Sequence, residues 1–371
     1  MSWEDYFKPG AMSGWYDYID INVVKLPDNL PMPPTDDFSL LFAQCWHLQD
    51  ISSLSNWDVS KVRNMNRMFE NCCKLKDITA LAKWNVSNVE NMEGVFSQCR
   101  ELQDITALAD WDIGKVTSIR CMFYGCERIQ DITALSNWDV SNVCDMYNLF
   151  ADCHILKDIS ALAKWNTSNV TDMSGIFSEC HRLEDINALS SWDTSSVTGM
   201  STIFSICKQL RDITVLSMWD TRNVEYMSCM FYGCEQLKDI SALSSWNVSN
   251  VCDMSYMFRE CKRIQDITAL SNWDVSNVWD MSGMFHSCEQ LQDISALAKW
   301  NVSSVEHKDV MFYDCYTKAD LTPLLGKGND HKEPITGSPT LLFQWEINEL
   351  KTHITRLEKK ITELTEMIER K

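Results

Sequence analysis

The chain has 371 residues, in which 33 Lys and Arg face 52 Asp and Glu, for a formal net charge of −19. Such an acidic chain is poorly suited to bind a phosphate backbone or an anionic membrane surface, so we expect no nucleic acid and no membrane insertion. The sequence has no apolar run of about eighteen residues, and its first residues lack the basic end and apolar stretch of a signal peptide. We therefore expect synthesis in the cytoplasm, with the sixteen cysteines present as free thiols.

The first 37 residues precede a region of strict repeats and do not share its pattern. They are rich in aromatic side chains and end in a proline cluster, LPDNLPMPP at 26–34. An array of repeats must cover the apolar side of its first member. Residues 1–37 are therefore predicted to form an N-terminal cap.

Residues 38–325 repeat with a period of 27. The sixteen letters RIQDITALSNWDVSNV occur at 128–143 and again, unchanged, at 263–278, which is five periods later. We call a set of residues spaced 27 apart a register column. Four such columns are unbroken over ten or eleven members: Trp57 to Trp300, Phe42 to Phe312, Cys45 to Cys315 and Asp50 to Asp320.

Within one period the apolar residues lie mostly three apart, as in Leu75, Ile78, Leu81 and Trp84. This spacing fits neither the 3.6-residue period of a helix nor the two-residue period of a strand. It predicts a coil that turns corners and stacks on the next coil. About ten inward side chains contribute roughly 15–30 kcal/mol, whereas ordering one period costs about 40 kcal/mol. One coil alone is therefore not expected to fold.

The stretch F-x-x-C-x-x-L-x-x-I-x-A at 69–80 resembles the spine of leucine-rich repeats. More narrowly, LSNWDVSNV followed by VxxMxxMFxxC resembles the BspA-type leucine-rich-repeat surface proteins. This resemblance implies a repeat solenoid of about 10–11 turns and a role in surface attachment or adhesion. It also implies a short parallel strand at residues 77–80, with Ile78 and Ala80 inward, and a short helical turn at each Met-Phe-x-x-Cys.

Several columns allow two readings. The aspartates from Asp50 to Asp320 either accept hydrogen bonds from the residues that follow them or form a strip that binds cations. The tryptophan and methionine columns are predicted to be core. His154 and His181 directly follow Cys153 and Cys180, which would allow a metal site. We expect the cysteines to point inward and the histidines outward, and predict no metal and no cofactor.

Positions that vary between repeats carry the prediction of a partner-binding surface. Aromatic residues replace the Asp, Ser or Gly of other repeats at four places: Tyr226, Tyr232, Tyr256 and Trp279. Aromatic side chains on an otherwise polar solenoid suit a contact with a protein partner. Incidental packing between turns is the alternative.

Residues 326–338 are predicted to be a linker, and residues 339–371 a coiled-coil helix. Apolar residues alternate there by three and four, with Ile at every a position and Leu at most d positions. This combination favours a parallel dimer, while a trimer and a helix folded back on the solenoid stay open. The predicted oligomerisation seam comprises Phe343, Ile347, Leu350, Ile354, Leu357, Ile361, Leu364 and Ile368.

No glycine-rich phosphate loop, nucleophile elbow or zinc-protease motif occurs, so we predict no catalytic residues and no enzyme. The predicted function is a protein-binding scaffold, in which the coiled coil doubles the number of binding surfaces. The alternative is a structural or adhesive component of a virion or cell surface.

Overall fold

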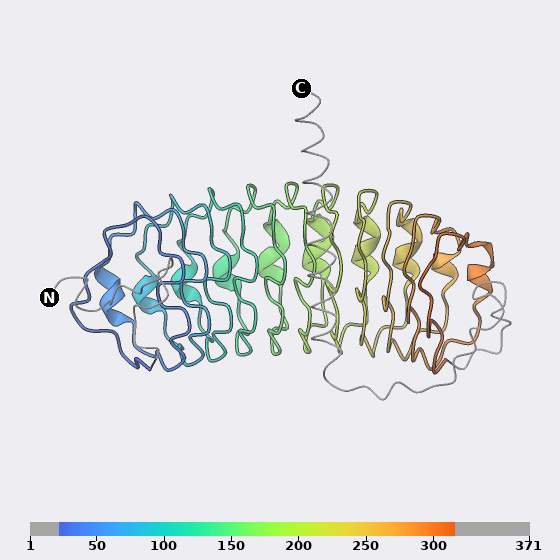
Figure 1. The fold of residues 1–371 in the computed structure, drawn as a ribbon, viewed down its shortest axis with the longest axis horizontal. Coiled ribbons are helices and arrows are strands. Elements are labelled where there is room, and N and C mark those ends of the chain that lie inside the picture. The colour runs from blue at the N-terminus through green and yellow to red at the C-terminus, as the bar shows by residue number, and fades with distance from the viewer. Residues whose placement is uncertain (1–21, 316–371) are drawn as a thin grey trace, which may run out of the picture. The chain divides into compact units, whose positions relative to one another are not determined.

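The computed structural model describes residues 22–315, which form a stack of coils with one coil for each period. Successive coils lie side by side along one axis, from the blue to the orange end of the ribbon (Figure 1). Parallel backbone bridges join each coil to the next, from the pair Asp37 and Asn64 to the pair Asp280 and His307. Residues with the same place in the period are therefore neighbours in space, as the repeat predicts.

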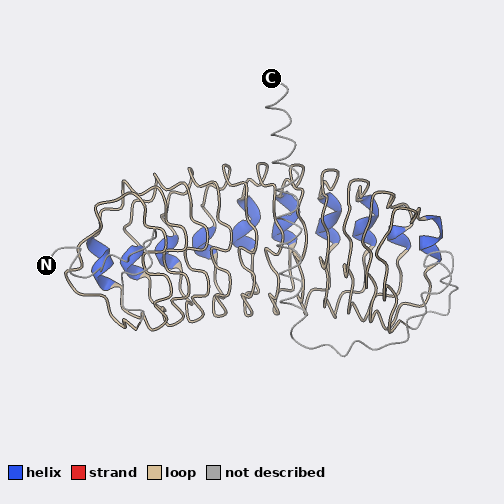
Figure 2. Ribbon diagram, viewed as in Figure 1, coloured by secondary structure: helices blue, strands red, loops and turns tan. Residues whose placement is uncertain are grey.

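Each coil in this part of the chain contributes one short 3-10 helix, and these helices lie beside one another (Figure 2). The helices are η2 (Ser52–Asn56), η3 (Thr79–Leu81), η4 (Thr106–Leu108), η5 (Thr133–Leu135), η6 (Ser160–Lys164), η7 (Asn187–Ser191), η8 (Thr214–Met218), η9 (Ser241–Ser245), η10 (Thr268–Leu270) and η11 (Ser295–Lys299). Each follows a buried isoleucine, such as Ile78 before η3.

The predicted strand at residues 77–80 is wrong, because this segment leads into η3. Asp77 explains the difference, since its Oδ1 accepts a hydrogen bond from the backbone N–H of Thr79 at 2.8 Å. This turn starts a helix where the repeat spine implied an extended chain. The predicted orientation holds: Ile78 is buried, Ala80 packs partly against the core, and Thr79 is exposed.

The predicted helical turn at Met-Phe-x-x-Cys is also wrong, because this segment carries the bonds between coils. We call residues 65–71 and their equivalents the ladder segment. The N–H groups of Met65, Arg67, Phe69 and Asn71 donate to carbonyls of the next coil at 2.7–3.0 Å. The intervening N–H groups, such as that of Met68, donate within their own coil to the carbonyl three residues back. The segment is thus a run of tight turns that is hydrogen-bonded like a parallel sheet.

Two residues in each ladder segment adopt the left-handed conformation. In one coil they are Arg67, at φ 53°, and Asn71, at φ 60°. The same two columns stay left-handed through the stack, whichever residue type occupies them. Left-handed backbone costs a residue with a Cβ about 1 kcal/mol or more. The bonds to the neighbouring coil offset this cost.

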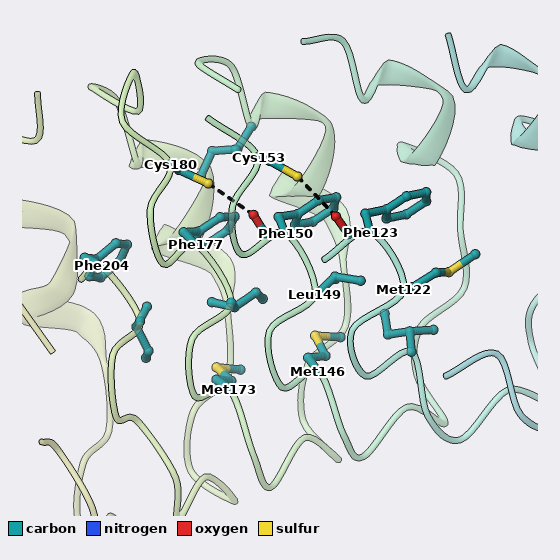
Figure 3. Packing of buried hydrophobic residues seen from close by; sticks show 14 of the residues in the cluster. Met122, Phe123, Met146, Leu149, Phe150, Cys153, Met173, Phe177, Cys180 and Phe204 are labelled. Atoms are coloured by element: carbon teal, nitrogen blue, oxygen red, sulfur yellow. Dashed lines mark hydrogen bonds between the residues drawn. The ribbon is translucent and has the colours of Figure 1, made fainter. Parts of the chain in front are cut away.

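The core consists of the columns that the sequence singled out. Successive Phe rings from Phe42 to Phe312 stack with centroids 5.3–6.1 Å apart, and Trp57 lies parallel to Trp84 at 6.4 Å. Figure 3 shows Phe123, Phe150 and Phe177 in one row. The methionines of the column from Met65 to Met281 are buried as well.

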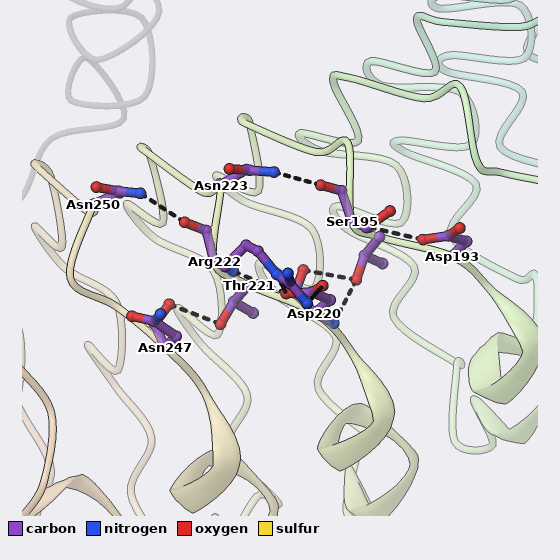
Figure 4. A network of polar contacts seen from close by, with 9 residues as sticks. Asp193, Ser195, Asp220, Thr221, Arg222, Asn223, Asn247 and Asn250 are labelled. Carbon is purple, nitrogen blue, oxygen red and sulfur yellow. Dashed lines mark hydrogen bonds and ion pairs between the residues drawn. The ribbon is translucent and has the colours of Figure 1, made fainter.

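The corner after each tryptophan is closed by polar side chains. The Nδ2 of Asn223 donates to the carbonyl of Ser195 at 2.7 Å, and the Nδ2 of Asn250 donates to that of Arg222 at 2.7 Å (Figure 4). Within one corner, the N–H of Ser195 donates to Asp193 at 2.9 Å. The Asp or Asn that follows each tryptophan thus accepts a backbone N–H in this turn, as Asp193 and Asn247 do.

The described residues before the first coil contact it directly. Leu26 and Leu30 are buried, and the carbonyl of Leu30 accepts a hydrogen bond from the Nε1 of Trp57 at 3.0 Å. In the other coils the equivalent acceptor is a leucine of the preceding coil. Residues 22–37 therefore take the place of a preceding coil, and the boundaries predicted for a cap stay a prediction.

Candidate functional site

Two of the four predicted partner-binding residues meet around an arginine. The guanidinium carbon of Arg259 lies 5.5 Å from the centroid of the Tyr232 ring and 5.6 Å from that of the Tyr256 ring. Both distances lie within the range of a cation–π interaction. Burial raises the pKa of both phenols, so the two rings are neutral at physiological pH.

Arg259 is only partly satisfied by its surroundings. Its side chain is about a quarter exposed, and its Nε lies 3.4 Å from the Oε1 of Glu260. That distance does not make a hydrogen bond, and Nε is buried without a hydrogen-bond acceptor. Arg259 thus lies near two aromatic rings, and its Nε–H has no hydrogen-bond acceptor.

The other two predicted residues flank Cys252. The pKa of this thiol is raised to about 11, first by burial, while hydrogen bonds from Trp279 and Tyr226 act in the opposite direction. Trp279 is 37% exposed, and its ring meets that of His307 edge-on at 5.6 Å. The four predicted residues therefore form two pairs, one around Arg259 and one around Cys252.

Sequence reasoning missed Arg259, His286 and Tyr313, which continue the column of Tyr232 at intervals of 27. The rings of His286 and Tyr313 lie 5.0 Å apart. The signal was present, because this column changes there from small residues to Tyr, Arg, His and Tyr. We call Tyr226, Tyr232, Tyr256, Arg259 and Trp279 the aromatic cluster.

The aspartates of the column from Asp50 follow the first of the two interpretations, in which the carboxylates accept hydrogen bonds from the residues after them. Each described member, from Asp50 to Asp293, accepts a hydrogen bond from the backbone N–H two residues further on, at 2.8–2.9 Å. Hydrogen bonds from Thr214 lower the pKa of Asp212. A shallow depression of about 440 Å³ lies along this column, lined by Arg128, Asp131 and Asp158 among others. One oxygen of each carboxylate therefore already accepts a hydrogen bond within a turn of the chain. This weakens the interpretation of the column as a cation-binding strip.

His154 and His181 point outward and their neighbouring cysteines inward, as predicted. Cys153 and Cys180 are fully buried, and their thiols donate to the carbonyls of Phe123 and Phe150 at 3.4 and 3.3 Å (Figure 3). Burial raises the pKa of both thiols. The two cysteines therefore cannot join the histidines around a metal. Glu179 does approach both imidazoles, a contact that sequence reasoning missed.

The predicted coiled-coil residues, from Phe343 to Ile368, lie outside the described residues. Within residues 22–315, no helix has both the length and the apolar character needed to cross a bilayer.

Comparison with known proteins gives a family. A family profile described as "Mycoplasma protein of unknown function, DUF285" matches residues 36–161, 144–265 and 238–320. A search of curated proteins finds no match.

Solved structures of low similarity also match. An internalin from Listeria monocytogenes is 14% identical, with a TM-score of 0.38, over 79% of this chain and 83% of that one. A leucine-rich-repeat protein from Bacteroides ovatus is 16% identical, with a TM-score of 0.29, over 81% and 82%. A leucine-rich cell surface protein from Faecalibacterium prausnitzii is 15% identical, with a TM-score of 0.24, over 61% and 74%.

Proposed function

We propose that this chain, which belongs to the family described as "Mycoplasma protein of unknown function, DUF285" and is a leucine-rich-repeat protein of the BspA type, is a scaffold that binds a protein partner. The family match spans most of the chain, from residue 36 to 320. The coils build a long, regular surface, and specificity can arise only where that surface departs from the repeat.

The aromatic cluster is the observation that carries this proposal. Tyr, Trp and Arg are the residue types that contribute most of the binding energy in protein interfaces. Here the guanidinium of Arg259 lies within 5.6 Å of two tyrosine ring centroids, its Nε has no hydrogen-bond acceptor, and Trp279 is more than a third exposed. An acidic group of the partner would pair with the exposed part of the Arg259 side chain and bury the rings.

The coiled coil predicted for residues 339–371 belongs to the same proposal. Two solenoids joined through this seam would present two copies of the aromatic cluster. A partner that is itself multivalent would then bind with an effective concentration set by the linker.

The experiment compares capture of partners by the full chain and by its variants, using lysate of the source organism and quantitative mass spectrometry. The test variant is Tyr226→Ala, Tyr256→Ala, Trp279→Ala. The matched control is Trp46→Ala, which removes a half-exposed tryptophan from the first coil. Circular dichroism checks that each variant keeps its fold.

The proposal predicts a protein that is captured by the wild-type chain and the control and is lost with the triple variant. A partner captured equally by all three would overturn the assignment of the cluster. Stoichiometric recovery of the chain in a large assembly, unaffected by the triple variant, would instead favour the structural alternative.

A further inference from the structure

A cluster of metal-ligating side chains lies on the solenoid surface and includes none of the residues of the aromatic cluster. His154 and His181 occupy the same column in adjacent coils, and their rings stack with centroids 4.6 Å apart and planes at 2°. Glu179 lies two residues before His181, and its backbone carbonyl accepts the N–H of His181 at 2.8 Å. The ladder bonds between the two coils therefore place these three residues together.

The three side chains converge on one point. The Oε2 of Glu179 lies 4.0 Å from the Nε2 of His154 and 3.9 Å from that of His181. One ligand atom from each of the three lies within 4.8 Å of the others. Ligands of a tetrahedral zinc ion, at about 2.0–2.1 Å from the metal, are about 3.3 Å from each other. The Glu179 oxygen must therefore close on each imidazole nitrogen by about 0.6–0.7 Å, the two imidazole nitrogens must close by up to about 1.5 Å, and the rings must tilt out of parallel.

The side chains have the freedom that this adjustment requires. His154, His181 and Glu179 are 34%, 33% and 29% exposed, so each can rotate while its backbone stays fixed by the ladder.

We propose that His154, Glu179 and His181 bind one divalent transition metal ion of the zinc class. Two imidazoles and one carboxylate are ligands that zinc and its first-row neighbours accept, whereas Mg²⁺ and Ca²⁺ prefer oxygen ligands alone. The partly exposed site leaves a coordination position for water. The carboxyl group of Asp152 lies one coil before Glu179 in the same column, close enough for the charges of the two side chains to interact.

The test measures zinc binding to the full chain after removal of bound metal with a chelator. Isothermal titration calorimetry gives the affinity and stoichiometry for the wild type, for Glu179→Gln and for the double variant His154→Ala, His181→Lys. Lysine at 181 repeats the residue found one coil further on, at Lys208, so the fold should tolerate it. The control is His286→Ala, which removes a histidine outside the proposed site, whose ring lies 5.0 Å from that of Tyr313.

The site predicts the loss of one zinc equivalent in the double variant, at least about tenfold weaker binding in Glu179→Gln, and no change in the control. Cobalt bound at this site should show d–d absorption without a thiolate charge-transfer band, because Cys153 and Cys180 point into the core. Unchanged zinc stoichiometry in the double variant would overturn the proposal. A thiolate band that persists there and accounts for all the bound metal would overturn it equally.

Discussion

Equivalent residues make the same side-chain hydrogen bond to a backbone carbonyl in successive coils. The Nε1 of a tryptophan donates to a leucine carbonyl of the preceding coil, at 2.8–3.3 Å through the stack. From Cys72 to Cys315, the thiol of each register cysteine donates in the same way to a phenylalanine carbonyl, as Cys207 does to Phe177 at 3.2 Å. These carbonyls also accept a backbone N–H of their own coil, as Leu162 does from Trp165 and Phe177 from Cys180, so the side chains add second hydrogen bonds that join adjacent coils.

Trp192→Phe tests this residue-scale role. The substitution keeps an aromatic ring and removes the donor that bonds the carbonyl of Leu162 at 3.1 Å. The carbonyl keeps the backbone N–H of Trp165 as a donor. The loss of one hydrogen bond, about 0.5–1.5 kcal/mol, and of part of the buried ring should therefore lower the free energy of unfolding in urea by about 1 kcal/mol or more. Trp46→Phe is the control, because Trp46 is half exposed, and it should stay within about 0.5 kcal/mol of the wild type. Equal effects of the two variants would contradict this role.

Asp253 gives a prediction about pH. Burial, and less strongly the charge of Asp280, raise its pKa to about 6, from 3.8. The native state thus favours the protonated form, and its stabilising contribution is complete below pH 3.8 and lost as the pH rises through 6. Asp253→Asn should preserve the turn, because Asn64 accepts the N–H of Asn66 at the equivalent position.

The variant should therefore match the wild type near pH 4 and exceed its stability at pH 7. The expected gain is on the order of 1 kcal/mol, since partial exposure screens the charge. Urea midpoints at the two pH values measure it. If the wild type instead becomes more stable relative to the variant between pH 4 and pH 7, the predicted direction of the pH dependence is wrong.

The ladder segment is the element that defines the coil, and its left-handed residues aim their side chains along the stack. A Cβ at Gly283, where φ is 58°, would lie 2.5 Å from two carbons of the Tyr256 ring in the preceding coil. The tyrosine therefore lies over a glycine, and the aromatic cluster depends on that glycine.

Gly283→Ala should destabilise the chain by about 2 kcal/mol, through left-handed strain and the clash with the ring. Gly114→Ala is the control, since Gly114 has no positive φ and a Cβ there comes no closer than 3.3 Å to a flexible Asp112 oxygen. It should cost under about 1 kcal/mol. Thermal and urea unfolding give both values. Adding Tyr256→Ala should recover the part due to the clash, and no recovery would contradict the packing described here.

At this scale the sequence predicted the columns but not the local conformation. A period of 27 fixes which residues become neighbours, so the core of Trp, Phe, Cys and Met could be identified from letters alone. Apolar residues three apart fit successive turns as well as short strands or helices. Glycine occupies the left-handed columns in only some coils, as at Gly94 and Gly125, and other residue types occupy them elsewhere, as at Arg67 and Asn71. The glycines alone therefore did not reveal that every coil is left-handed there, and the resemblance suggested a helical turn instead. Glu179 escaped notice because it lies 25 residues from His154, off the period.

Residues 22–315 form a one-dimensional array, in which the 3-10 helices contact those of neighbouring coils. The contacts between helices follow this order, since each of η2 to η11 touches the helices of adjacent coils. The fold, the aromatic cluster and the metal-ligand cluster thus rest on one relation: coils of equal length with identical register.

The oligomeric state is a prediction at this scale. If residues 339–371 form a parallel two-stranded coil, light scattering should give twice the chain mass for the full chain and the chain mass for a version that ends at Gly326. Ile354→Lys with Leu357→Lys should give the monomer mass too, because both charges would fall in the seam. The same number of chains per particle in all three proteins would contradict the prediction.

Deletion of residues 85–111 tests the stacking most directly, because it removes one period and leaves Trp84 followed by Asp112, as one tryptophan–aspartate corner. Its counterpart, deletion of residues 85–97, removes less chain but breaks the register. Urea unfolding followed by circular dichroism should show a cooperative transition for the first variant, with a slope slightly smaller than that of the wild type in keeping with the smaller surface exposed. The second variant should lose that transition or unfold at much lower urea. Equal cooperativity and stability in both variants would show that coils of 27 residues do not stack in register.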